Sequence, residues 1–127
     1  MPIHSEIDPI GRLVHTRIVR PLTGADLRQH VGAVAQETIH DYRELIDWRE
    51  LGPMQITSKE LLEAVHQARE MADGRSLARR AFVVSDDDGF MMARTFAALV
   101  AGWVRVGVFE DPRAAKSWLD GPSQLDR

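Results

Sequence analysis

The feature that most constrains the fold is an uninterrupted apolar run, Ala81-Phe82-Val83-Val84, bounded by Arg80 and Ser85. A short continuous run of this kind is typical of a strand that is buried on both faces of a sheet. A strand with one face in water would instead alternate apolar and polar residues. The chain must therefore cover both faces of a sheet, and helices are the usual cover for such strands.

The rest of the chain alternates strand-like and helix-like segments. Residues Leu13–Val19 are rich in β-branched side chains and follow a turn at Asp8–Gly11, so together with His4–Ile7 they predict an opening hairpin. Apolar residues recur at helical spacing after each later strand. The helices are expected to begin at Thr23, Thr57, Asp86 and Asp111, and the later strands to span Tyr42–Trp48, Ala81–Val84 and Val104–Phe109.

This pattern predicts an α/β fold, a mixed five-stranded sheet with four helices in the order ββαβαβαβα. The length of 127 residues fits a single domain, 1–127, with an ordered core of about 3–121. We expect the strands at 81–84 and 104–109 to form one core with the last helix. That core would bury Phe82, Val84, Val106, Val108, Trp118 and Leu119.

The helix after residue 56 has the clearest start signal in the chain. Thr57 and Glu60 have the spacing of a capping box, in which each side chain accepts a hydrogen bond from the other residue's backbone. Ile56 and Leu61 occupy the two positions of a hydrophobic staple around it. The direction in which this helix enters the fold should therefore be well fixed.

Composition excludes several functional classes. The 16 basic and 19 acidic residues give a net charge of −3, so no electrostatic nucleic-acid footprint is expected. With no cysteine, disulfides, thiolate metal sites and cysteine nucleophiles are ruled out. The longest apolar run, Phe96–Val104, is about half of the roughly 20 residues needed to span a bilayer. We therefore expect a cytoplasmic protein without a transmembrane segment, and no motif calls for a cofactor.

Several segments together resemble the SpoIIAA-like branch of the STAS superfamily, the sulphate transporter and anti-sigma-factor antagonist domains. The resemblance covers about His4–Leu119, and its most distinctive part is the closing helix with its two alanines followed by Trp118-Leu119. It implies a compact α/β sandwich, often bacterial, of regulatory or unassigned function, related in fold to the CRAL-TRIO lipid-transfer domains. The segments that carry it are PLTGADL, LIDWRE, ITSKEL and VFEDPRAAKSWL.

In the anti-sigma-factor antagonists of this superfamily, a regulatory serine begins the helix after the third strand. By position, that resemblance points to Ser58 and Thr57 as phosphoacceptors, although the Asp-Ser-Ser-Gly motif of those proteins is absent here. A phosphate on Ser58 would face the positive end of the helix dipole. The simpler interpretation is that both residues only start the helix.

Carboxylates follow two neighbouring strands of the predicted sheet. Asp47 ends one strand, and Asp86 and Asp87 follow the next, at the edge where open α/β sheets bind ligands. Oxygen ligands there could hold Mg²⁺, which would make the chain a small magnesium-dependent enzyme that handles phosphate groups. The simpler interpretation is that Asp86 caps a helix and Asp47 pairs with Arg49.

Bulky apolar residues lie near the same edge. Adjacent methionines cannot share one face of a helix, so Met91 or Met92 should be partly exposed. An exposed Trp48, Met91 and Arg94 would be residue types enriched at interfaces, and they suggest a homodimer. The expected ligand or partner surface comprises Asp47, Trp48, Arg49, Asp86, Asp87, Phe90, Met91 and Arg94.

Our leading hypothesis is therefore a non-catalytic regulatory or binding module. Its partner would be a protein or a small apolar or anionic ligand, bound at the carboxyl edge of the sheet. The alternative is the magnesium-dependent enzyme that uses Asp47 with Asp86 or Asp87.

Overall fold

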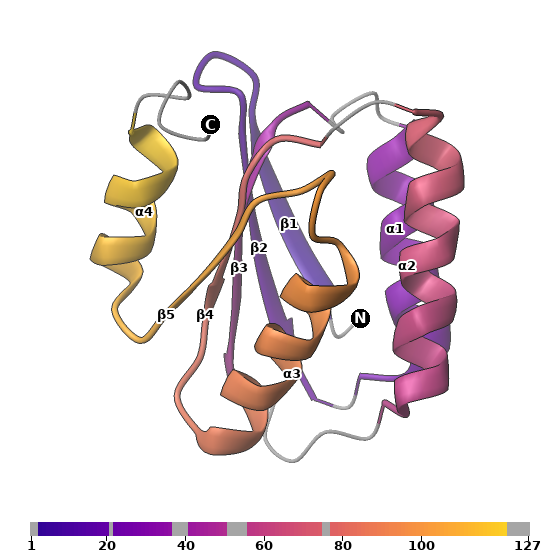
Figure 1. The fold of residues 1–127 in the computed structure, drawn as a ribbon. Coiled ribbons are helices and arrows are strands. Elements are labelled where there is room, and N and C mark those ends of the chain that lie inside the picture. The colour runs from indigo at the N-terminus through magenta and orange to yellow at the C-terminus, as the bar shows by residue number, and fades with distance from the viewer. Residues whose placement is uncertain (1–2, 21, 37–40, 51–55, 75–76, 122–127) are drawn as a thin grey trace.

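The computed structural model describes residues 3–20, 22–36, 41–50, 56–74 and 77–121. Within these residues the predicted order of strands and helices, ββαβαβαβα, is confirmed (Figure 1). The elements are β1 Ile3–Asp8, β2 Leu13–Val19, α1 Gly24–Gln36, β3 Arg43–Glu50, α2 Ser58–Ala72, β4 Arg80–Val83, α3 Asp87–Leu99, β5 Val106–Phe109 and α4 Pro112–Asp120.

The five strands form one mixed sheet in the order of the sequence, β1-β2-β3-β4-β5. β1 and β2 form the predicted hairpin and pair antiparallel, whereas β2, β3, β4 and β5 run parallel to one another. Each parallel pair is joined by a crossover helix. Because such crossovers keep one hand and all three step in the same direction, α1, α2 and α3 lie on the same face of the sheet.

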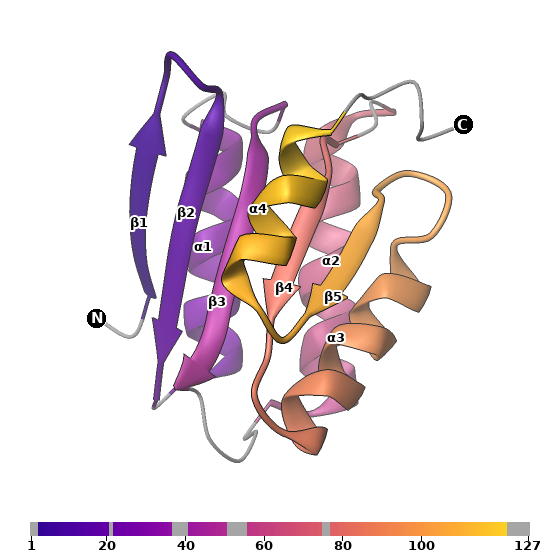
Figure 2. The same cartoon turned by 90° about the vertical axis from the view of Figure 1, so that its left-hand side faces the viewer.

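The last helix lies on the opposite face, which gives three layers (Figure 1). Figure 2 shows α4 in front of the sheet, over β3 and β4, with α1 and α2 behind it. β4 is therefore covered on both sides, and all four residues of the apolar run, Ala81–Val84, are buried as predicted. α4 leaves β1 and β2 uncovered on its own face of the sheet.

The two faces of β4 contribute to two separate cores, so the prediction of one core is wrong. Phe82 and Val84 pack with β5 residues Val106 and Val108 beneath α3. Leu119 of α4 packs on the other face, against Ala81 and Val83. The physical reason is the period of two in a strand, which sends successive side chains to opposite faces. The half-buried Trp118 belongs to the second core.

Local signals set most element boundaries as expected. The capping box at Thr57 and Glu60 is present, and Asp86 and Asp111 each cap the helix that follows. β3 extends two residues beyond the predicted end at Trp48. β5 begins two residues later than predicted, because the backbone N–H of Val104 still bonds to the Val100 carbonyl in the turn after α3.

Candidate functional site

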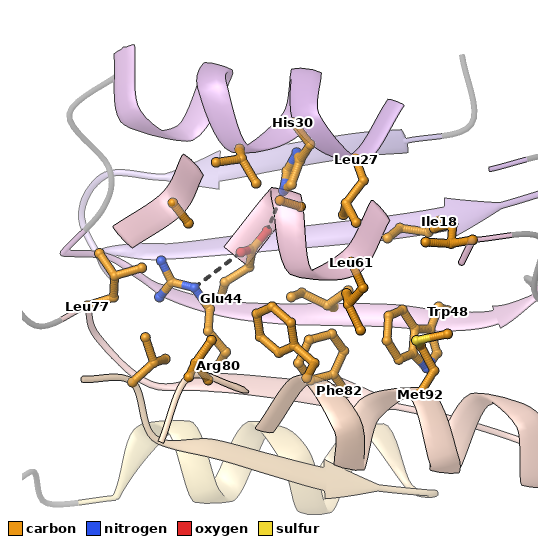
Figure 3. Close-up of a pocket in the computed structure, with 18 of the residues that line it drawn as sticks. Ile18, Leu27, His30, Glu44, Trp48, Leu61, Leu77, Arg80, Phe82 and Met92 are labelled. Atoms are coloured by element: carbon orange, nitrogen blue, oxygen red, sulfur yellow. Dashed lines mark hydrogen bonds and ion pairs between the residues drawn. The ribbon is translucent and has the colours of Figure 1, made fainter. Parts of the chain in front are cut away.

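A cavity of about 130 Å³ lies between the sheet and the layer formed by α1, α2 and α3 (Figure 3). Its lining comes from all three helices and from β2, β3 and β4, and it is mostly aliphatic and aromatic. α2 contributes Ala64 and Ala68, whose small side chains leave room that larger residues would fill. Met71, near the end of α2, lines the cavity and is 37% exposed, so the wall of the cavity reaches the surface there.

Three charged or titratable side chains meet at one end of this cavity. One carboxylate oxygen of Glu44 lies 3.3 Å from Nε of Arg80, and the other lies 3.0 Å from Nε2 of His30 (Figure 3). Glu44 and Arg80 are only 4% and 5% exposed. We call these three residues, His30, Glu44 and Arg80, the polar cluster.

The strand register explains how two of these charges come together. Glu44, Ile46 and Trp48 alternate onto one face of β3, and Arg80 and Phe82 onto the same face of β4. Glu44 and Arg80 are register partners across the two parallel strands. The α1 helix crosses above them and adds His30 from the helix layer. Three elements that are separate in the sequence thus build the polar cluster.

Further hydrogen bonds hold the polar cluster in place. The Thr16 hydroxyl donates to the Glu44 carboxylate at 2.5 Å. Since Thr16 has one hydroxyl hydrogen, Ser5 Oγ, 3.0 Å from Thr16 Oγ1, is the donor in that second pair. Arg80 Nη1 donates to the Tyr42 carbonyl at 2.8 Å. These contacts reduce the cost of burying an ion pair.

The neighbours of Glu44 also set its charge state. Burial alone would raise the pKa of the Glu44 carboxyl. The hydrogen bond and charge of His30, the charge of Arg80 and the hydrogen bond from Thr16 outweigh it and lower this pKa to about 2. Burial of the His30 ring lowers its pKa, but the hydrogen bond and charge of Glu44 outweigh this, so the net shift is upward. Glu44 is therefore an anion at neutral pH, and His30 is poised to take a proton.

The other end of the cavity is aromatic. Trp48 and Phe82 pack with their ring centroids 4.5 Å apart, and Phe96 meets Phe82 edge-on at 5.3 Å. Met92 lies beside Trp48 (Figure 3). Trp48 is only 8% exposed, and within the described part of the chain its buried Nε1–H has no acceptor. The prediction that Trp48 is exposed is wrong, because the longer β3 keeps this residue inside the strand on the helix-covered face.

The predicted carboxylates at the sheet edge have other partners. Asp47 accepts two hydrogen bonds from the Arg49 guanidinium, at 3.0 and 2.7 Å. Partial burial would raise the pKa of Asp47, but its contacts with Arg49 outweigh this and hold the pKa below its ordinary value. Asp86 accepts from the backbone N–H of Gly89 at 2.7 Å, and Asp87 is exposed in the first turn of α3. Across the described residues, no three histidine, aspartate or glutamate side chains gather into a metal site.

The remaining predicted residues lie on the surface. Thr57 is occupied by the capping box, and Ser58 is exposed as the first residue of α2. Of the two methionines, Met91 is 63% exposed and Met92 faces the cavity, so the prediction that one would be exposed is confirmed. Phe90 is also exposed, with the Arg94 guanidinium 5.6 Å from its ring centroid.

Sequence reasoning missed the whole polar cluster. The available signal was Glu44, a carboxylate that alternates with Ile46 and Trp48 along one face of a strand. A charge at an inward strand position needs a partner, and Arg80 begins the neighbouring apolar run. His30 gave no such signal, because its position on α1 depends on how that helix packs.

The fold places this chain among proteins with a SpoIIAA-like α/β sandwich, as the resemblance in the sequence implies. The chain is similar in structure to an uncharacterized protein of the DUF3478 family, with a SpoIIAA-like fold, from Shewanella loihica PV-4. The TM-score is 0.59 at 20% sequence identity, and the match covers 92% of this chain and 91% of that chain. At this identity the likeness establishes the fold alone.

No family model matches the chain, and no curated protein matches it. None of the described helices is long and apolar enough to cross a membrane.

Proposed function

We propose that this chain is a non-catalytic binding module of the SpoIIAA-like type that holds a small apolar molecule between its helix layer and its sheet. The observation that carries the proposal is the cavity of about 130 Å³. Native interiors are packed to the density of organic crystals, with few voids larger than a water molecule. A cavity of this volume in a domain of this size is therefore expected to bind a ligand.

The size and lining of the cavity define the class of ligand. An engineered apolar cavity of about 150 Å³ stays dry when empty and binds benzene. The present cavity is comparable in volume and has a similar lining of leucine, isoleucine and phenylalanine side chains. A compact ligand of benzene size is therefore favoured over a long acyl chain. Its route of entry would pass Met71, where the cavity wall reaches the surface.

The sequence predicted a binding site at the carboxyl edge of the sheet, whereas this proposal places the ligand in the cavity between the sheet and the helix layer. Trp48 and Met92 still connect the two places, since both line the cavity near that edge. The neighbouring Met91 and Phe90 lie outside on the same helix, α3. Occupation of the cavity would therefore affect the binding of a partner to α3.

The proposal is tested by titrating the protein with toluene and recording amide chemical shifts by NMR. We expect saturable shifts at residues that line the cavity, with no comparable change on α4. An Ala64→Leu variant should lose these shifts, because the added side chain would occupy the cavity from α2. The matched control is Ala114→Leu, at an exposed position of α4 on the far face of the sheet.

Melting temperatures would establish that both variants are folded. Shifts that are absent in the parent protein, or that persist unchanged in Ala64→Leu, would contradict the proposal.

A further inference from the structure

We propose that the natural ligand is a small apolar carboxylic acid, bound as its anion, and that His30 takes up one proton when the acid binds. This inference rests on the proposed function, because it names the chemical class of the molecule in the same cavity. It is carried by the position and charge of the polar cluster.

The polar cluster lies at one end of the cavity (Figure 3). His30, Glu44 and Arg80 are all part of the cavity wall, which elsewhere is almost entirely apolar. Glu44 and Arg80 lie together at one end, with His30 on the helix above them, and Trp48 and Met92 lie at the other end (Figure 3). A ligand that matches this wall has an apolar body and one polar group at one end.

The charge of the polar cluster favours an anionic ligand. Arg80 and the Glu44 carboxylate form a buried pair that sums to zero. Protonation of His30 adds one positive charge beside this pair, and a charge added to an apolar cavity is costly unless an opposite charge arrives with it. A ligand carboxylate brings that negative charge. A ligand cation would add to the charge, and a neutral ligand would leave it uncompensated.

His30 has a second hydrogen-bond donor when it is protonated. A protonated imidazole has two N–H donors. Nε2–H is used by Glu44, at 3.0 Å, which leaves Nδ1–H as the second donor. Charge-assisted hydrogen bonds to carboxylates are about twice as strong as neutral ones. His30 can thus hold Glu44 with one nitrogen and keep a second donor for an anion.

The groups around His30 make this protonation depend on the ligand. Glu44 from β3 favours the imidazolium and Arg80 from β4 opposes it, while α2 lines the cavity opposite with Leu61, Ala64 and Ala68. A bound anion adds a second negative neighbour and raises the affinity of His30 for a proton further. By linkage, the anion binds most tightly where His30 is already protonated. Its affinity then falls by up to about tenfold per pH unit between the pKa of His30 in the free protein and the higher pKa of His30 in the complex.

The test compares benzoate with benzamide, which have nearly the same shape but differ in charge. Benzoate is ionised both at about pH 5.5 and at about pH 8, so a change in its affinity over this range reports on the protein. We expect benzoate to bind at least about tenfold more tightly at the lower pH, and benzamide to bind equally at both. At about pH 8, calorimetry in buffers of different ionisation enthalpy should show uptake of a proton with benzoate alone.

His30→Gln keeps a side chain that can donate to Glu44 but cannot gain a charge. We expect its benzoate affinity to become independent of pH, as the benzamide affinity of the parent protein is. The matched control is His66→Gln, which removes an exposed histidine from α2 and should behave as the parent protein does.

The outcomes separate this inference from the proposed function. If toluene and benzamide bind but benzoate does not bind more tightly at low pH, the inference is overturned and the proposed function stands. Persistence of the pH dependence in His30→Gln would also overturn it. If none of the three probes binds, both proposals fall.

Discussion

Burial of the Glu44 carboxylate is unfavourable by itself, and it requires partners that fix how several elements align. A buried carboxylate is unfavourable by several kcal/mol unless its charge and lone pairs are matched. Thr16, His30 and Arg80 provide that match from three different elements. Removal of any one partner would leave part of the charge uncompensated. The polar cluster therefore fixes how α1, β2, β3 and β4 align around the cavity.

We predict that Glu44 makes the protein sensitive to acid. Its pKa is about 2 in the folded state and near 4.5 when unfolded, so its contribution to stability is present above about pH 4.5. That contribution is lost as the pH falls toward 2, and it amounts to about 3 kcal/mol. Urea unfolding at several pH values measures it.

A Glu44→Gln variant should be less stable than the parent at neutral pH and should lose less stability on acidification. The other acidic groups are common to both proteins and cancel in the comparison. Parallel stability curves for the two proteins between about pH 4.5 and pH 2 would contradict the prediction.

α4 and the three crossover helices have different roles, because only the crossover helices line the cavity. α4 begins at the Asp111 cap and places Ala115 and Leu119 against the far face of the sheet. At its end, Arg43 and Arg79 donate to the Leu119 carbonyl at 2.6 and 2.9 Å. Arg43 is the first residue of β3, and Arg79 directly precedes β4. α4 therefore stabilises the sheet without contributing to the cavity on the other face.

This arrangement predicts which residue anchors α4. Leu119 is fully buried, so Leu119→Ala should cost about 3 kcal/mol through lost burial and the space left behind. Trp118 is half-buried, and Trp118→Ala should cost less, about 2 kcal/mol. Denaturant unfolding of both variants tests this ranking. A larger loss for Trp118→Ala would mean that contacts of its ring with Phe109 or Arg79 outweigh the burial of Leu119.

The elements were predictable where their signals are local. The capping box needs only Thr57 and Glu60, three residues apart, and the buried run at 81–84 is continuous. The cavity was not predictable in the same way. A strand that is apolar on both faces gives no rule for which face Arg80 takes, and the partner of Glu44 on α1 depends on helix packing. The residues that form the site can therefore be identified only from the way the helix layer packs on the sheet.

α3 lines the cavity with one face and exposes apolar side chains to solvent on the other. Its inward face supplies Met92 and Phe96 to the cavity. Its outward face leaves Phe90 42% exposed and Met91 63% exposed, next to Arg94. Solvent-exposed aromatic and methionine side chains that cluster on one helix are typical of an interface. The simplest partner for a patch of this kind is a second copy of the chain, related by a two-fold axis.

We predict that the protein forms a homodimer through this face of α3. Light scattering at increasing concentration should show the mass of two chains, and a Phe90→Ser, Met91→Ser double variant should return the mass of one. Trp48 is not part of this face, because it is buried beneath α3, so the exposed apolar area rests on Phe90 and Met91. Ile10→Ser is the matched control, since Ile10 is 96% exposed at the tip of the β1–β2 hairpin and away from α3. A monomer at every concentration, or a dimer that survives the double variant but not Ile10→Ser, would place self-association elsewhere or exclude it.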